Sequence, residues 1–135
     1  MTTTLPAVSE TVPDLRPGAI SRTTLALFAG ASGDHNPIHI DIDSARAAGF
    51  DDVFAHGMLS FAYLGRLLTD WIPQSRILEL SARFTAITPV LAESVLSAQI
   101  TKIVTVDGEQ RANLDLTAVL ADGTRTLLGA AVVAW

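Results

Sequence analysis

The chain has 135 residues and no cysteine, it carries a formal net charge of −5, and 49% of its residues are hydrophobic against 17% charged. This length suits one domain, residues 1–135, with a single sizeable core. The lack of cysteine excludes disulfides, thiol catalysis and zinc–thiolate sites. The nine Lys and Arg residues are scattered singly, which argues against nucleic acid or an anionic membrane surface as a partner. The small charged fraction predicts that part of the surface docks on another subunit.

The first 18 residues contain no candidate for catalysis. Residues 1–18 are rich in Thr, Ser and Pro and end in RPG, so we expect a flexible lead-in or a short edge strand. They lack the charged-then-apolar order of a signal peptide, and no apolar segment of the chain could span a bilayer without interruption. We therefore expect a cytoplasmic protein with no membrane partner.

A short amphipathic helix is predicted next. Ser21 is a plausible N-cap, and the segment RTTLALFAGA after it places Leu25, Phe28 and Ala29 on one face. The sequence SGD then ends the helix.

An irregular loop and a second short helix follow. Pro37 within DHNPIHID excludes a continuing helix, so we expect Asp34 and His39 to lie on a loop. The segment DSARAAGF predicts a short helix that is capped by Asp43 and stopped by Gly49.

The remainder predicts one long helix followed by a sheet. Residues 56–72 are apolar around nearly the whole circumference of a helix that Pro73 closes, so we expect this helix to be buried. Apolar residues then alternate with polar ones from Leu78 to Ala86, and again in SVLSAQITKIVTV, QRANLDLTAVLA and TRTLLGAAVVAW. Asp-Gly pairs at 107–108 and 122–123 predict hairpin turns. The expected fold is α+β, with an antiparallel sheet wrapped around the long central helix and a short helical segment before it.

The best candidates for chemistry lie in the loop and at the start of the long helix. Asp34 and His39, held on a loop stiffened by Pro37, can converge on one water or substrate proton and act as acid and base. Gly57 stands in the first helical turn, where main-chain N–H groups have no intrahelical acceptor. A developing oxyanion could bind there.

These residues resemble the signature of a known family. The pattern F-x-G-x-S-G-D-x-N-P-I-H over residues 28–39, together with AHGM at 55–58, is similar to the two hallmarks of the MaoC-like (R)-specific enoyl-thioester hydratases and dehydratases. The resemblance implies the hot-dog fold and reversible hydration of trans-2-enoyl thioesters of coenzyme A or an acyl-carrier protein to (R)-3-hydroxyacyl thioesters. It also implies that Asp34 and His39 are the catalytic pair and that Gly57 is the oxyanion donor.

Three further residues are expected to bind or position the substrate. Asn36 would orient the loop, and His56 would cap the helix or position Gly57. Phe61, with Leu64, would line an acyl tunnel. We expect no cofactor and no metal.

Other functions remain open from the sequence. A metal-dependent hydrolase or lyase could use His35, His39, Asp41 and His56, although their spacing matches no zinc pattern. The chain could also be a non-catalytic or partner-dependent hot-dog subunit of a heteromeric dehydratase, or an acyl thioesterase. Whatever the function, we expect at least a dimer, either a homodimer or a heterodimer with a related hot-dog subunit. Finally, PVLAESVL carries Ala92 and Glu93 where the family pattern has Gly and Asp, so we expect a differently shaped turn there.

Overall fold

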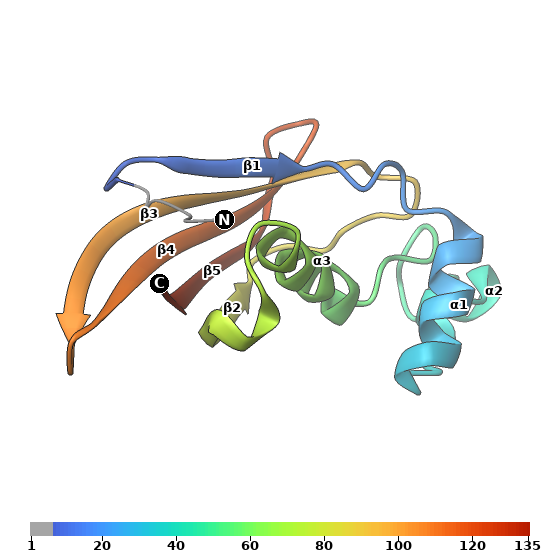
Figure 1. The fold of residues 1–135 in the computed structure, drawn as a ribbon. Coiled ribbons are helices and arrows are strands. Elements are labelled where there is room, and N and C mark those ends of the chain that lie inside the picture. Colours follow the sequence, from blue (N-terminus) through green and yellow to red (C-terminus); the bar gives the residue numbers. More distant parts are fainter. Residues whose placement is uncertain (1–6) are drawn as a thin grey trace.

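The computed structural model describes residues 7–135, in which a curved antiparallel sheet of five strands arches over one helix (Figure 1). The strands lie in the order β1 (Thr11–Leu15), β3 (Ser94–Val106), β4 (Glu109–Leu120), β5 (Arg125–Ala134) and β2 (Ile77–Phe84). The helix under the arch is α3 (Gly57–Thr69). This arrangement confirms the predicted α+β class. None of the helices within the described range is long and apolar enough to cross a membrane.

The predicted hairpin turns set the register of the sheet. Asp107 and Gly108 have φ values of 51° and 82°, as a two-residue type I′ turn requires. This turn pairs Val106 with Glu109, and the ladder continues to Ser94 opposite Leu120. Because side chains alternate between the two faces of a strand, one face of each of these long strands meets the helix. The resulting core joins buried residues of the sheet with Leu64, Leu67 and Leu68 of α3.

Helix α3 is buried on one side only, so the expectation of a helix buried all round is wrong for the chain alone. Leu59 and Ser60 are buried with the three core leucines, whereas Met58 is 54% exposed and Arg66 is also exposed. The physical reason is that the sheet arches over one side of the helix and no described element covers the other.

Strand β2 departs from simple alternation. The pairing of β2 with β5 shifts between Ile77 and Glu79, so Ile77 and Leu80 both pack against the core. Such a shift in register changes which face of the sheet the following side chains point to. Leu78 and Phe84, expected on the buried face, are 43% and 52% exposed. A single-turn helix, η2 (Gln74–Arg76), precedes the strand.

The helical segment before α3 consists of α1 (Arg22–Ser32), the single turn η1 (Pro37–His39) and α2 (Ile42–Ala47). Ser21 caps α1 by accepting a hydrogen bond from the Thr24 N–H at 3.0 Å, as predicted. The cap of α2 is Asp41 and not the expected Asp43. The Asp41 carboxylate accepts from the Asp43 N–H at 3.1 Å and from the Ser44 hydroxyl at 2.8 Å, and these bonds hold its pKa below the ordinary value.

A second, smaller core attaches this segment to the start of α3. It joins buried residues of α1 and α2, and of the chain just before α1 and just before α3, to the first turn of α3: Ile20, Leu25, Ala45, Val53, Ala55 and Leu59. A bidentate ion pair lies beside this smaller core. The Arg22 guanidinium donates to both carboxylate oxygens of Asp52, at 2.9 and 2.6 Å. The pKa of Asp52 is lowered, mainly by this bond to Arg22.

We predict that Asp52→Asn lowers the free energy of unfolding at neutral pH, because Asn cannot pair with the charge of Arg22. A carboxyl whose pKa is lowered by folding stabilises the protein above its unfolded pKa and loses this effect as pH falls through the folded value. The difference between variant and wild type should therefore shrink in acid, as pH falls below the ordinary pKa of an aspartate side chain and through the lowered pKa of Asp52.

Urea unfolding followed by circular dichroism over a pH series measures this difference. Asp51→Asn is the matched control, because the Asp51 carboxylate takes part in none of the ion pairs of the described chain. A difference that persists unchanged in acid, or that the control reproduces, contradicts the prediction.

Candidate active site

The loop after α1 is shaped by short polar side chains that bond to its own backbone. Helix α1 ends at Gly33, whose φ of 76° is the left-handed conformation that glycine adopts readily. Asp34 then accepts from the Asn36 N–H and Asn36 from the Ile38 N–H, each at 3.2 Å. Pro37 begins the single turn that ends at His39. The loop therefore carries Asp34 and His39 on a fixed bend, with Asn36 bonded to the loop itself.

The environment of His39 determines which ring nitrogen is free. His39 is 8% exposed, and its Nδ1 lies 2.8 Å from the main-chain carbonyl oxygen of Phe54. A carbonyl oxygen can only accept, so Nδ1 carries the proton. In the neutral ring Nε2 therefore holds the lone pair, which is the form that a base requires.

His56 joins the loop to the start of α3. It is 1% exposed, and its Nε2–H donates to the main-chain carbonyl of Asp34 at 3.1 Å. Its ring stacks on that of His39, with centroids 4.0 Å apart and planes at 30°, and Phe28 packs against it edge-on at 5.0 Å. His56 Nδ1 is buried without a hydrogen-bond partner among the described residues. His56 thus fixes both the Asp34 backbone and the His39 ring.

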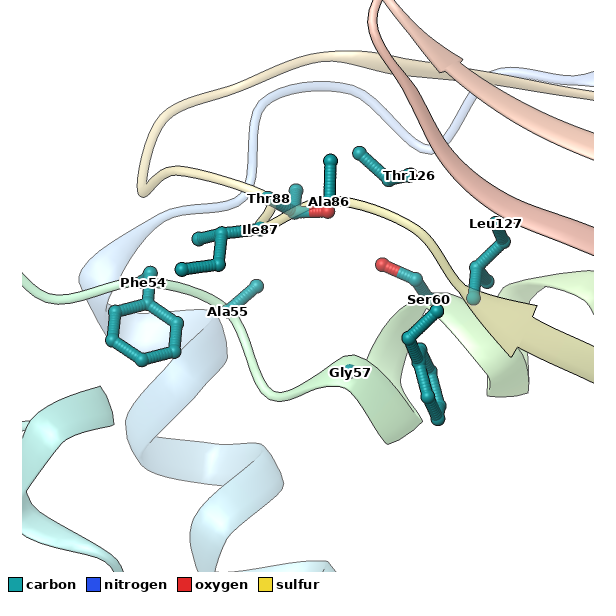
Figure 2. A pocket seen from close by; sticks show the side chains of 10 residues that line it. Phe54, Ala55, Gly57, Ser60, Ala86, Ile87, Thr88, Thr126 and Leu127 are labelled. Carbon is teal, nitrogen blue, oxygen red and sulfur yellow. The ribbon is translucent and has the colours of Figure 1, made fainter.

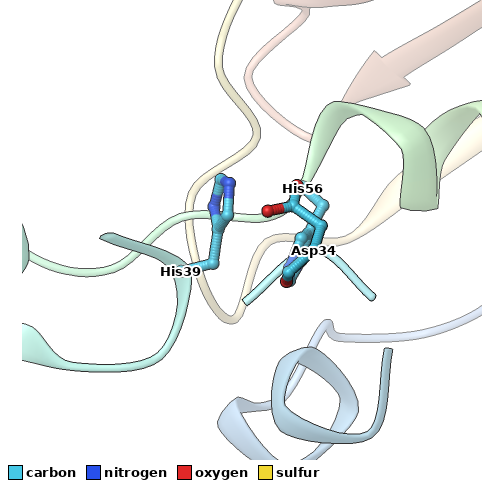
Figure 3. A group of neighbouring side chains, drawn as sticks. All are labelled: Asp34, His39 and His56. Atoms are coloured by element: carbon cyan, nitrogen blue, oxygen red, sulfur yellow. The ribbon is translucent and has the colours of Figure 1, made fainter. Parts of the chain in front are cut away.

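Asp34, His39 and His56 form one cluster, seen together in Figure 3. One ring nitrogen of each histidine and a carboxylate oxygen of Asp34 lie within 4.8 Å of one another. Two groups that bond the same water at about 2.8 Å each lie roughly 4 to 5 Å apart. The Asp34 carboxylate is exposed and points toward the His39 ring, so one water can reach both.

The same cluster could hold a metal ion, but it is not the ligand set considered from the sequence. His35 is exposed and outside the cluster, and the Asp41 carboxylate is occupied in capping α2. Asp34 joins His39 and His56 in their place.

Gly57 is the first residue of α3, directly after His56. Its N–H has no intrahelical acceptor, and no other backbone acceptor in residues 7–135 receives it. A Cβ atom at this position would lie 2.9 Å from the ring of Phe84, closer than unstrained contacts allow. Glycine therefore lets the Phe84 ring pack close to an unpaired amide at the positive end of the helix dipole.

A cavity of about 320 Å³ lies next to Gly57, between the start of α3 and the chain that leaves β2 (Figure 2). Neither Asp34 nor His39 lines it; Phe54, whose carbonyl holds His39, and Gly57 connect the cavity to the cluster. Its lining is mostly apolar and consists of Phe54, Ala55, Gly57, Ser60, Phe84, Ala86, Ile87, Thr88, Thr126 and Leu127.

The residues that line the cavity differ from those predicted from the sequence to line an acyl tunnel. Phe61 is half-buried on α3 and does not line it, and Leu64 lies in the main core. Ser60, Thr88 and Thr126 were not identified from the sequence, because the apolar pattern around them is the same as that of ordinary core. Ala86 was expected at the end of a strand, but β2 ends at Phe84 and the chain turns along the cavity.

Comparison with known proteins shows the family and the fold of this chain. A family model described as a MaoC like domain matches residues 5–122. The (R)-specific enoyl-CoA hydratase of Rhodospirillum rubrum is 32% identical over 82 residues, which cover 61% of this chain and 57% of that enzyme. The peroxisomal multifunctional enzyme type 2 of Mus musculus is 34% identical over 92 residues, or 65% of this chain and 12% of that protein. The chain thus spans less than two thirds of either relative.

A solved structure gives the fold. The (R)-hydratase from A. caviae involved in PHA biosynthesis superimposes with a TM-score of 0.83 at 25% identity, over 95% of this chain and 96% of that one. The fold is therefore the hot-dog fold, as the sequence resemblance implied. Because the family model covers most of the sequence, the chain belongs to the MaoC-like domain family.

Proposed function

We propose that this protein reversibly adds water to trans-2-enoyl thioesters, carried on coenzyme A or an acyl-carrier protein, to give (R)-3-hydroxyacyl thioesters. The observation that carries the proposal is the cluster in which an Asp34 oxygen and a His39 ring nitrogen lie within 4.8 Å. They stand beside the unpaired amide of Gly57 and the apolar cavity that this residue lines.

In hydration, the oxygen of water bonds to C3 of the enoyl group while His39 Nε2 takes one of its protons. The electron pair of the double bond moves toward the thioester, whose oxygen becomes an enolate stabilised by the Gly57 N–H. C2 then receives a proton from the Asp34 carboxyl group. Asp34 and His39 act as a coupled pair that passes one proton between them, and the reverse sequence eliminates water.

The cavity would receive the acyl chain. With the thioester oxygen at Gly57, carbons beyond C3 can enter a space lined by side chains such as Phe54, Ile87 and Leu127. Burial of apolar carbon there contributes to binding. We assign Asn36 and His56 to positioning, because Asn36 Oδ1 and His56 Nε2 bond the loop and neither residue lines the cavity.

We also propose that two copies of the chain associate through α3 and β2. Strand β2 is the last in the sheet and pairs with β5 only, and an edge strand can pair antiparallel with its own copy across a two-fold axis. The open side of α3 lies beside β2. Met58 on α3 is 54% exposed, and Leu78 on β2 is 43% exposed. A partner of related sequence could use the same edge, which would give a heterodimer.

Three alternative functions predict different experimental results. A thioesterase would release free coenzyme A without hydration. A metal-dependent lyase, which the spacing of Asp34, His39 and His56 would permit, would lose activity with a chelator and contain metal by elemental analysis. A partner-dependent subunit would act only when a related hot-dog protein is added.

We predict that Asp34→Asn and His39→Ala each slow hydration by about 10²- to 10⁴-fold, the usual contribution of a general acid or base. The measurement is loss of enoyl absorbance with a panel of trans-2-enoyl-CoA thioesters, together with assay of free coenzyme A. His35→Ala is the matched control, because His35 is an exposed neighbour outside the cluster. Hydrolysis by the wild type without any hydration would overturn the proposal.

Two substitutions of Gly57 isolate its amide. Proline lacks the N–H but fits the first position of a helix, and His56 before it, with φ −55° and ψ 131°, has the conformation that proline favours. Alanine adds a Cβ atom near Phe84 as proline does, but keeps the N–H.

We predict that Gly57→Pro lowers kcat by about 10²- to 10³-fold relative to Gly57→Ala, the typical effect of one oxyanion donor. Thermal unfolding of both variants checks that the fold is retained. Equal rates for the two folded variants would remove the Gly57 amide from the mechanism.

We predict that the purified chain has about twice its monomer mass of 14.3 kDa in light scattering after size exclusion. Leu78→Lys should shift it to the monomer, because a charged edge resists pairing. Leu27→Lys is the control, since Leu27 is 70% exposed on α1 and away from β2. An active wild-type monomer would contradict the proposed association.

A further inference from the structure

Ser60 brings an unpaired hydroxyl into the cavity. It is 3% exposed and lies on α3 three residues after Gly57. Its hydroxyl points into the cavity (Figure 2) and has no hydrogen-bond partner in the described chain. A serine within a helix often bonds the carbonyl four residues earlier, but the Ser60 hydroxyl makes no such bond to His56.

One other hydroxyl and one main-chain carbonyl of the cavity lining are already paired. The Thr126 hydroxyl donates to the Ala118 carbonyl at 3.3 Å, and the Thr88 carbonyl accepts from the Ala55 N–H at 2.9 Å. Among the cavity's lining residues, Ser60 alone carries a buried side-chain atom without a partner in residues 7–135. Since native structures pair nearly all such groups, the partner of this hydroxyl should be an atom that enters the cavity.

The position of Ser60 indicates which part of a ligand it would meet. An α-helix rises 1.5 Å per residue, so Ser60 lies about 4.5 Å further along α3 than Gly57. A thioester whose oxygen binds the Gly57 amide would bring its acyl chain past Ser60 a few carbons beyond C3. A plain alkyl chain would bury the hydroxyl against carbon and leave it unpaired, which is unfavourable.

We propose that Ser60 is a specificity-determining residue that selects acyl chains bearing a hydroxyl group a few carbons beyond C3. This inference rests on the proposed function for the way the chain enters. A binding site built to pair with a hydroxyl discriminates strongly against the analogue that lacks it, because its own polar group is then left unpaired. The preferred substrates are therefore oxygenated enoyl thioesters, not plain fatty acyl ones.

Binding of unreactive, saturated thioesters tests the proposal without turnover. Calorimetry would compare hexanoyl-CoA with its 4-, 5- and 6-hydroxy forms on wild type, Ser60→Ala and Ser94→Ala. Ser94 is the matched control, because its hydroxyl is equally unpaired, its side chain is 5% exposed, and it lies on β3 outside the cavity.

We expect wild type and Ser94→Ala to bind at least one hydroxylated form about tenfold or more tightly than hexanoyl-CoA. Ser60→Ala should abolish that preference and bind hexanoyl-CoA at least as well as wild type does. A ratio of affinities that Ser60→Ala leaves unchanged, equal binding of all four ligands to wild type, or no binding of any, overturns the proposal.

The failure of this inference can be told from the failure of the proposed function. If the hydroxyl preference depends on Ser60 but no enoyl thioester is hydrated, the proposed reaction falls and the specificity site remains. If plain and hydroxylated enoyl thioesters are hydrated at equal rates by wild type and by Ser60→Ala, the reaction stands and the role of Ser60 falls.

Discussion

A hydrogen bond from the His56 ring to the main-chain carbonyl of Asp34 joins two parts of the chain that lie 22 residues apart. One is the loop that follows α1, and the other is the residue directly before the unpaired amide of Gly57. Because the His56 ring also stacks on His39, this one residue sets the carboxyl group, the imidazole and the amide relative to one another. The proposed acid–base chemistry depends on that alignment, since groups that share one water must hold their positions within a fraction of an ångström.

The rest of the fold supports this junction from two sides. The main core holds α3 against the sheet through Leu64, Leu67 and Leu68, so the first turn of the helix has a fixed position. The smaller core attaches α1 and α2 to the same turn. The cavity lies where these two packed regions meet β2 and the chain after it. Among the side chains of its mostly apolar lining, Ser60 carries the one buried polar atom without a partner in the described structure.

Local signals in the sequence predicted much of the fold. Strand β3 runs over the residues expected for it, because alternation over its first half and the Asp-Gly turn after it, whose φ values suit a hairpin, mark its extent. Ser21 and Gly33 likewise mark the ends of α1 through their own backbone preferences. The predicted N-cap of α2 was wrong, because Asp41 and Asp43 are the same residue type and either could cap a helix. The Ser44 hydroxyl, which bonds to Asp41, decides between them.

Long-range features of the site were harder to predict. The sequence pointed to Asp34, His39 and Gly57, but not to the stacking of His39 on His56, which requires the loop to fold back on α3. Ser60 gave no signal, because a serine within an apolar helix is usually a small core residue. The open side of α3 was also missed, since an apolar pattern cannot distinguish a face that meets the sheet from one that the chain itself leaves uncovered.

The most direct test of the account is a crystal structure of Asp34→Asn with a trans-2-enoyl-CoA bound. The account predicts the thioester oxygen within about 3 Å of the Gly57 nitrogen, C3 facing His39 Nε2 with a water between them, and the acyl chain in the cavity beside Ser60. A thioester oxygen bonded elsewhere, with C3 turned away from His39, would contradict it.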